Sequence, residues 1–478
     1  MIARPISCLY FSNLFFMQTI LASIRALPQY QQLLNDVQSK QVQPGLGLPR
    51  SARLPILAAL HKDMNAPILL ITDRADHALS LFDELGFWVE SARYHFAEPN
   101  PLFYEQAAWG MATRRERLQA LIALSEYHLP FAQKPEIPPI LVASARSLMI
   151  RTLPRRDFLK ACKKLAVGQT TQPDTLSRSW VEIGYQRANT VLEPGQFSIR
   201  GGIMDLWTPA ETLPVRLDFF GDEIETIRRF DPASQRTVEK LESILVTPAR
   251  EYLATGEREM ELSEFHIPLL HKQPASLLDY LPQNTVVLID DLSIVESMAA
   301  EVEEQAVRFR KESIEEDVLS EDFPLPYIPW SELHEGLHGK AVVELGYGGE
   351  QRPETEELES SLALCFGHDD RFGGRLKPFV EYLGSIVESG EQVVVVSRQS
   401  PRLHEMWLEH INNGQQTVDN VIVEFVEASL SEGFILKSQV LYHLITDSEV
   451  FGWERPQPRT RQRKVAETPE SIYADLQA

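Results

Sequence analysis

The segment from Gly47 to Leu54, GLPRSARL, has the spacing of a phosphate-binding loop but only part of its chemistry. In G-x-x-x-x-G-K-[ST], backbone N–H groups surround the phosphates, the lysine reaches the β and γ oxygens, and the hydroxyl binds Mg²⁺. Here Ala52 replaces the second glycine, Arg53 the lysine and Leu54 the hydroxyl residue, while Pro49 lacks an N–H. We therefore predict a degenerate nucleotide site that does not hydrolyse ATP. Its residues are Gly47, Ser51, Ala52, Arg53 and Leu54.

Asp290 and Asp291 follow an apolar run at 286–289, where a nucleotide-hydrolysing protein carries its Mg²⁺-binding aspartate. The chain continues with Leu292 and Ser293 and gives no D-E-x-H string. An aspartate after a strand also commonly caps the next helix, and we favour that role. Arg53 remains a cation that could meet a phosphate, so weak nucleotide binding stays open. The scattered histidines form neither a catalytic triad nor a metal-ligand spacing. We therefore predict no catalytic residue, no metal site and no cofactor.

A second group of charged residues lies on a predicted β-hairpin. Residues 215–220, VRLDFF, alternate apolar and polar side chains, which predicts a half-buried strand. Gly221 and Asp222 supply a turn before a return strand that begins at Glu223. The return strand alternates less cleanly, because Ile227 falls on the face of Glu223. Upstream, Gly201-Gly202 inside an apolar run indicates a bulge or a close backbone approach. On this pattern alone, an ordinary hairpin domain with a solvated charged face is the first interpretation.

The literal sequence of this region carries a resemblance. Its parts are GYQR at 184–187, GQFSIRGGIMDLW at 195–207 and RLDFFGDEIETIRRFDPASQR at 216–236. Together they resemble the UvrA-interaction domain that the excision-repair subunit UvrB shares with the bacterial transcription-repair coupling factors (Mfd). The DLW and SQR strings are closer to the coupling factors, as is the degenerate loop, which would be intact in UvrB. FGGRL at 372–376, SRQSPRL at 397–403 and TDSEVFG at 446–452 are similar to the third domain of that family.

The resemblance implies a multidomain α/β fold: a degenerate P-loop helicase-like (UvrB-like) parallel-sheet domain with an inserted β-rich UvrA-interaction domain, plus a further small α/β domain. A length of 478 residues also predicts about three domains. We expect an N-terminal extension at 1–17, the sheet domain at 18–150 and 249–340, and the UvrA-interaction domain at 151–248. The third domain is expected at 341–453 and a basic flexible linker at 454–478.

The elements of these domains follow from the pattern of apolar residues. A helix at 19–39 should break at Pro28, and helices are expected at 51–62, 74–85 and 145–152. Apolar runs at 68–72, 140–143 and 286–289 predict buried strands of one parallel sheet. In the third domain, the run at 392–396 predicts a strand that is followed by a helix at 401–411.

If the interaction domain works as in its relatives, charged groups on a rigid sheet should contact UvrA. Arg187 and Arg200 offer planar guanidinium groups for carboxylates of the partner. Phe197 and Phe220 are candidate aromatic anchors. The acidic residues expected to meet basic side chains are Asp222, Glu223 and Glu225. Three alternatives stay open: Arg200 pairs with Asp205 or Asp218, Phe197 is a core residue, and the acidic turn is simply solvated.

Composition limits the other partners. A formal net charge of −22 and a pI near 5.1 disfavour a chain that coats nucleic acid. Two basic clusters are present, at 151–164 and 455–464, but neither contains interleaved stacking aromatics. We therefore expect weak or no DNA binding. Three distant cysteines indicate neither a disulfide framework nor zinc, which fits the cytoplasm, and no run is long enough to span a membrane. The apolar stretch at 9–17 is better explained by an upstream start codon or a packed segment than by a signal peptide.

The resemblance covers nearly the whole chain but only the first half or less of the family protein. The polymerase-interacting domain, the translocase motor and the C-terminal masking domain would follow Ala478, so RNA polymerase binding is not expected of this sequence. We predict a non-catalytic, UvrA-recruiting N-terminal module of a coupling factor. The alternatives are a UvrB-like ATP-dependent DNA helicase subunit of the excision nuclease, which Leu54 and Pro49 argue against, and a stand-alone DNA-binding module, which the net charge disfavours.

Overall fold

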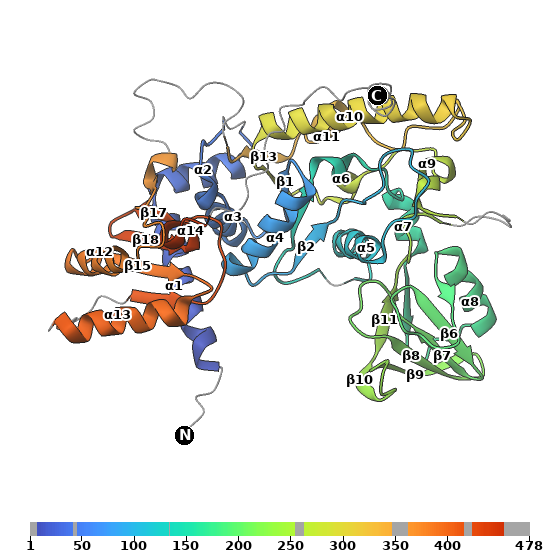
Figure 1. Cartoon of the computed structure of the whole chain (residues 1–478). Helices are drawn as coiled ribbons and strands as arrows, with labels where there is room; N and C mark the ends of the chain where they lie inside the picture. The colour runs from blue at the N-terminus through green and yellow to red at the C-terminus, as the bar shows by residue number, and fades with distance from the viewer. Residues whose placement is uncertain are drawn as a thin grey trace, which may run out of the picture. The chain divides into compact units, whose positions relative to one another are not determined.

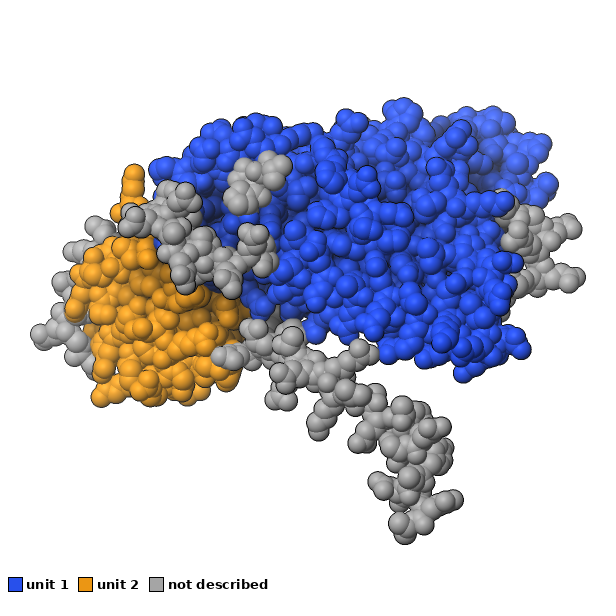
Figure 2. All heavy atoms as spheres, turned by 90° about the horizontal axis from the view of Figure 1, so that it is seen from above, with its two compact units in different colours: residues 1–366 blue, residues 367–478 orange. Residues whose placement is uncertain are grey.

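The structure, a computed structural model, describes residues 7–41, 45–132, 134–253, 262–346, 362–414 and 423–453. The chain forms two compact units, Met1–Phe366 and Gly367–Ala478 (Figure 2). The expected linker at 454–478, with its basic cluster, lies outside the described residues. Within the described residues, no helix has the length and apolar composition needed to cross a membrane.

A five-stranded sheet, in the order β13-β12-β1-β3-β2, organises the first unit (Figure 1). All four pairings are parallel. Every residue of β1, β3 and β12 is buried, as expected for parallel strands that are covered on both faces. The strands are β1 (Ile68–Thr72), β2 (Arg93–Phe96), β3 (Ile140–Ser144), β12 (Val286–Ile289) and β13 (Ala341–Glu344).

Helices cover this sheet. Leu69, Leu141 and Val287 project to one side and share a core with Leu121 of α5 and Val295 of α10. The break expected at Pro28 is present, since this proline is the first residue of α2. The α-helices of the sheet domain are α1 (Ser7–Ala26), α2 (Pro28–Gln38), α3 (Arg50–Met64), α4 (Ala75–Trp88), α5 (Met111–Ser125), α6 (Ala145–Met149), α9 (Ile267–Leu270), α10 (Leu292–Glu315) and α11 (Trp330–Gly336). Two short 3₁₀ helices lie at Glu264–His266 and Leu277–Tyr280.

A β-rich domain is inserted between β3 and β12. Its six-stranded sheet has the order β10-β9-β8-β7-β6-β5, and β4 pairs with β11 in a separate ribbon. One face of the sheet and helix α8 enclose a core that includes Trp180, Phe197 and Leu217. The elements are α7 (Arg155–Ala161), β4 (Lys163–Ala166), α8 (Pro173–Glu182), β5 (Gln186–Arg187), β6 (Gln196–Arg200), β7 (Ile203–Leu206), β8 (Val215–Phe220), β9 (Glu223–Phe230), β10 (Thr237–Leu241) and β11 (Ser243–Val246).

The second unit is a smaller α/β fold around the sheet β14-β17-β18-β15-β16. The strand expected at 392–396 and the helix after it are present as β15 and α13. Its elements are β14 (Phe366–Gly367), α12 (Leu376–Glu388), β15 (Gln392–Val396), α13 (Ser400–Gly414), β16 (Val423–Val426), β17 (Phe434–Lys437), β18 (Leu441–Thr446) and α14 (Asp447–Phe451).

The division between the two units differs from the expected boundary at residue 340. β13 begins at Ala341 but pairs in parallel with β12, in the register Val286 with Ala341 and Val287 with Val342. It is therefore the edge strand of the first sheet, and the second compact unit begins at Gly367.

Candidate protein-binding face and the remnant nucleotide site

The outer face of the six-stranded sheet, opposite its core, carries rows of charged side chains. The antiparallel pairings of β7, β8 and β9 align Asp205 with Arg216, and Arg216 with Arg228. In the next row outward, Asp218 lies between Ile203 and Thr226. Because opposed residues in neighbouring strands point to the same side, these acidic and basic groups meet across the strands. We call this surface the outer face.

Asp205 is the centre of the outer face. Its side chain is only 1% exposed and accepts hydrogen bonds from Arg200 Nη2 at 2.8 Å, Arg216 Nε at 2.6 Å and Arg216 Nη2 at 2.8 Å. These hydrogen bonds, opposed in part by burial, raise the pKa of Arg216. Gln235 also accepts from Arg216 Nη2, at 2.7 Å, and the guanidinium lies 4.3 Å from the ring centre of Phe230. One buried carboxylate thus holds two arginines in fixed positions.

The tip of the β8–β9 hairpin presents an aromatic ring. Phe220 is 81% exposed, and Asp222, Glu223 and Glu225 are exposed beside it. Gly221 makes the turn with φ 61°, a conformation that glycine adopts without steric cost. The backbone of the tip is held by hydrogen bonds from Thr171 N to Asp222 O at 2.7 Å. The exposed ring is therefore carried on an ordered turn.

A bulge explains the irregular alternation of the return strand. Phe219 pairs with Ile224 and Asp218 pairs with Thr226, so Glu225 is an extra residue. The extra residue resets the period, and both Ile224 and Ile227 are buried. Gly202 confirms the expected close approach, because a Cβ there would lie 3.0 Å from Phe219 O. The glycine pair also forms the turn between β6 and β7.

The residues predicted to bind a partner do not all lie on the outer face. Arg200 and Phe220 do, and Arg200 makes the internal pair with Asp205 that the sequence left open. Phe197 does not, since it is 1% exposed and packs edge-on against Trp180, with ring centres 5.4 Å apart. Phe197 is therefore a core residue, and its prediction as an anchor is wrong. Alternation along β6 points Phe197 toward the core and Arg200 toward the outer face.

Arg187 lies at the edge of the sheet on β5. It is exposed and forms no ion pair with any residue that the structure describes. The register of β5 with β6 pairs it with Phe197, which places it on the side opposite to Arg200. Arg216 and Arg228, which were not singled out from the sequence, lie on the outer face instead. The signal was available, since Arg216, Asp218 and Phe220 alternate along β8.

At the predicted nucleotide site, backbone N–H groups are already hydrogen-bonded within the protein. The N–H groups of Leu46, Gly47 and Leu48 donate to carbonyl oxygens of residues 344, 346 and 345, at 3.0, 2.9 and 2.9 Å. In a phosphate-binding loop such groups point at the ligand. Helix α3 does follow the segment, starting at Arg50, and Ala52 and Leu54 are buried in it. The donors near the start of the loop are therefore already bonded within the protein.

The charged residues of this site pair with each other. Arg53, at the lysine position, donates from Nη1 to Asp290 Oδ1 at 2.7 Å and from Nε to Leu48 O at 3.2 Å. Its side chain is 9% exposed. Asp290, at the metal-binding position, also accepts from Thr72 Oγ1 at 3.3 Å. Asp291 caps α10 by accepting from Ile294 N at 3.4 Å, so the capping role is confirmed for this aspartate. Ser51 Oγ is buried and has no hydrogen-bond partner within the described parts of the chain.

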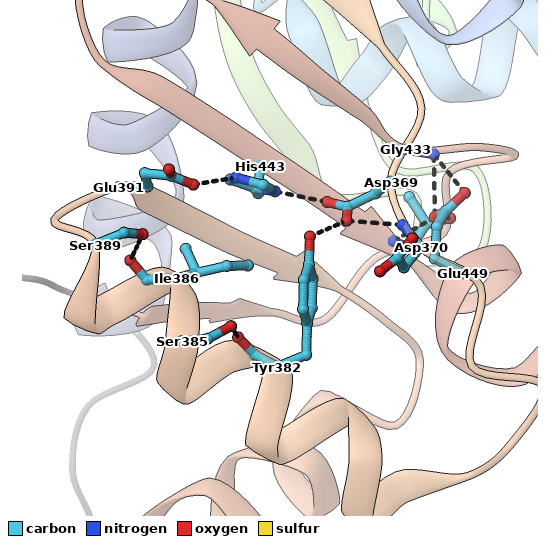
Figure 3. A network of polar contacts seen from close by, with 11 residues as sticks. Asp369, Asp370, Tyr382, Ser385, Ile386, Ser389, Glu391, Gly433, His443 and Glu449 are labelled. Atoms are coloured by element: carbon cyan, nitrogen blue, oxygen red, sulfur yellow. Dashed lines mark hydrogen bonds and ion pairs between the residues drawn. The ribbon is translucent and has the colours of Figure 1, made fainter.

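The second unit contains a buried polar network (Figure 3). His443 Nδ1 lies 2.8 Å from Asp369 Oδ2, and His443 Nε2 lies 2.8 Å from Glu391 Oε2. Tyr382 donates to the other Asp369 oxygen at 2.6 Å. Ionised carboxylates only accept hydrogen bonds, so both ring nitrogens must carry protons. Burial lowers the pKa of His443, but the hydrogen bonds and charges of the two carboxylates outweigh it and raise that pKa. Among the described residues, no group of side chains is arranged to hold a metal ion.

Within the inserted β-rich domain, residues 164–252 match the UvrB interaction domain family. This range contains the whole outer face. The protein is thus a two-unit α/β chain with a UvrB interaction domain inserted into its first unit.

Curated relatives extend the match beyond that domain. The transcription-repair-coupling factor of Bacillus subtilis is 29% identical over 327 residues, which are 59% of this chain and 27% of the relative. That of Myxococcus xanthus is 35% identical over 235 residues, 48% of this chain and 19% of the relative. That of Staphylococcus aureus strain MRSA252 is 22% identical over 510 residues, 96% of this chain and 42% of the relative. The resemblance drawn from the sequence is confirmed: the chain is related to the N-terminal portion of transcription-repair-coupling factors. It spans less than half the length of these relatives.

Proposed function

We propose that this chain recruits UvrA through the outer face of its UvrB interaction domain, as the N-terminal module of a coupling factor in transcription-coupled nucleotide excision repair. The observation that carries the proposal is the side chain of Phe220, 81% exposed on an ordered turn of the same sheet face that carries Arg200 and Arg216. Binding energy at protein interfaces is concentrated in such aromatic and arginine residues.

Pre-organisation supports the same surface. Asp205 holds Arg200 and Arg216 before any partner arrives, so less side-chain entropy is lost on binding. Half of the Arg200 side chain stays exposed, which leaves guanidinium donors for a carboxylate of the partner. The acidic tip at 222–225 would face basic residues. The expected UvrA surface therefore has an apolar pocket for Phe220, a carboxylate near Arg200 and a basic rim.

We infer further that the chain is non-catalytic. Arg53 and Asp290 bind each other, and backbone N–H groups of residues 46–48 donate to carbonyl groups. A nucleotide would have to break both sets of bonds, and no hydroxyl residue stands where Mg²⁺ would be bound. These observations disfavour the alternative of an ATP-dependent, UvrB-like helicase subunit. We also propose weak or no DNA binding by this chain, because its formal net charge is −22.

The test is equilibrium binding of the purified chain to UvrA. Phe220→Ala should weaken binding by at least about 2 kcal/mol, which is roughly thirtyfold, and Arg200→Ala should weaken it by about 1 kcal/mol or more. Matched controls lie on α8, which packs on the core side of the sheet: Val181→Ala and Arg178→Ala remove an exposed apolar and an exposed basic side chain. Both controls should bind as the unchanged protein does.

Arg187→Ala tests which side of the six-stranded sheet contacts UvrA. Because Arg187 lies opposite to Arg200, its loss should have the smaller effect if the outer face makes the contact. A well-folded chain that does not bind UvrA, or whose binding is unaffected by Phe220→Ala, would refute the proposal. A larger effect of Arg187 than of Phe220 would move the contact to the β5 edge.

A further inference from the structure

A cavity of about 320 Å³ lies within the first unit, lined by the start of α5 and by loops of the interaction domain. Helix α5 contributes residues 111, 112, 114, 115 and 118. The interaction domain contributes Gly184 and Gln186, residues 193–196 and the segment 249–250. Several of these belong to the sequence strings that carry the family resemblance, but the residues proposed to contact UvrA, Arg200 and Phe220, are not among them. The proposed UvrA contact therefore leaves this cavity without a role.

The polar lining of the cavity is strongly basic. Arg114, Arg115 and Arg250 contribute three guanidinium groups, against a single carboxylate from Glu193. Arg114 Nε and Arg115 Nε are buried and have no hydrogen-bond partner among the residues that the structure describes. A buried donor without an acceptor is unfavourable, and two such donors at one cavity indicate that an acceptor-rich group belongs there.

The third arginine is positioned by its neighbours. Arg250 Nη1 donates to the buried Glu264 Oε1 at 2.9 Å. Its aliphatic stem packs directly on Gly184, where a Cβ would lie only 2.5 Å from Arg250 Cγ. Gly184 has φ +94°, a conformation that other residues rarely adopt. The glycine of the GYQR string therefore makes room for a cavity arginine.

The start of α5 adds further donors. The helix begins at Met111 after Gly110, which provides no side-chain cap for the first N–H groups. The N-terminal end of a 15-residue helix carries partial positive charge. Gln196 accepts hydrogen bonds from Leu192 N and Glu193 N with its side-chain oxygen, which leaves its amide N–H groups as donors. Donors thus surround the cavity.

We propose that this cavity binds a small phosphate-bearing molecule. Guanidinium groups recognise phosphate oxygens through paired, charge-assisted hydrogen bonds. The volume is at the lower limit of ordinary ligand pockets, which favours a compact polyanion over a polymer. A bound phosphate would contact both α5 and the interaction domain, and would therefore stabilise their junction. The inference is independent of the proposed contact with UvrA.

The test is calorimetric titration of the full chain with inorganic pyrophosphate. Binding is expected, with a higher melting temperature in its presence. Arg114→Gln/Arg115→Gln should weaken the affinity at least about tenfold, since it removes two charge-assisted donors. The matched control is Arg155→Gln/Arg156→Gln, another adjacent arginine pair in the first turn of a helix but outside the cavity, and it should bind as the unchanged chain does.

Glu193→Gln should change the affinity for pyrophosphate in the opposite direction to the arginine variant. Glu193 is exposed on a loop and is the one carboxylate of the lining, so its neutralisation should tighten pyrophosphate binding. This variant keeps the test valid even if the arginine variant fails to fold. Absence of pyrophosphate binding by the unchanged chain would overturn the proposal. So would equal affinities for the unchanged chain, the folded arginine variant and Glu193→Gln.

Discussion

Replacing Glu251 with glutamine should destabilise the first unit more than any surface substitution. Glu251 follows β11, where the chain leaves the interaction domain, and accepts from Arg117 of α5 in two hydrogen bonds, of 2.6 and 3.0 Å. The two side chains are 0% and 2% exposed. Arg117 also donates to Ala97 O at 3.2 Å and lies 3.8 Å from the ring centre of Phe96. The pair therefore links the segment where the chain leaves the inserted domain to helix α5 of the parallel-sheet domain.

The magnitude follows from the burial. Glu251→Gln keeps the shape of the side chain but removes the charge opposite a guanidinium that water does not reach. Removing one partner of a buried pair typically costs about 3–5 kcal/mol, because the other charge is left uncompensated. Domains of this kind are stable by only about 5–15 kcal/mol, so the loss would be a large fraction of the total. We expect a clear fall in the urea concentration at the unfolding midpoint.

Urea unfolding followed by tryptophan fluorescence is a suitable assay, because the Trp109 ring lies 4.8 Å from the Arg117 guanidinium. The matched control is Glu315→Gln. Glu315 pairs with Lys311 at 3.8 Å on the surface of α10, with side chains 65% and 77% exposed, and its loss should cost at most about 0.5 kcal/mol. Equal costs for the two glutamine variants would refute the reasoning that burial makes the Arg117 pair indispensable.

Two further predictions concern the other charged clusters. Because the pKa of His443 is raised in the folded state, its interactions with Asp369 and Glu391 stabilise the second unit fully below the ordinary histidine pKa and are lost as pH rises through the folded value. The urea midpoint of that unit should therefore fall from pH 6 to pH 9, and His443→Gln should remove this part of the pH dependence; an unchanged slope would contradict it. At the remnant nucleotide site, Mg²⁺ and ATP should leave the melting temperature unchanged, both in the natural chain and in Asp290→Asn, which frees Arg53. A ligand that binds the native state raises the melting temperature, so any ATP-dependent rise would show that the loop still opens.

The buried strands were predictable because they are continuous apolar runs. β1, β12 and β15 lie within one residue of the ranges predicted from the sequence. β2 was not predicted, since Arg93–Phe96 mixes charged and aromatic residues at the edge of the sheet. β13 is a short edge strand whose sequence alone does not say which sheet it joins, and its parallel pairing with β12 decides this. Edge strands have the weakest apolar pattern, because they pair with only one neighbouring strand and bury less of their surface.

Helix α10 shows a different limit. The charged residues at 301–316 on their own indicate a solvent-facing helix, whereas α10 starts at Leu292. Val295, Ala299, Val302 and Ala306 form a buried stripe at helical spacing. The stripe is narrow and includes two alanines, so the many charged residues around it hide it in the sequence.

The outer face was only partly predictable, for a reason of geometry. A residue type suited to binding can point to either side of a strand, and one residue of register decides between them. Phe197 and Phe220 are both aromatic and both belong to the family strings, yet one is buried in the core and the other is almost fully exposed. The bulge at Glu225 shifts the period, so no fixed alternation could assign both halves of the hairpin.

At the predicted nucleotide site, the charged residues depend on contacts that the sequence alone does not show. The sequence identified the replaced residues, but the partner of Arg53 lies 237 positions away and is brought to it only by the pairing of β12 beside β1. A guanidinium that is 9% exposed needs an acceptor, because an unpaired buried charge is strongly unfavourable. Asp290 is that acceptor, and the carboxylate oxygen that binds Arg53 is then not free to bind a metal ion. Arg53→Lys and Leu54→Thr together should therefore not create a nucleotide site, because the backbone donors of residues 46–48 would remain bonded to the last residue of β13 and the two residues after it.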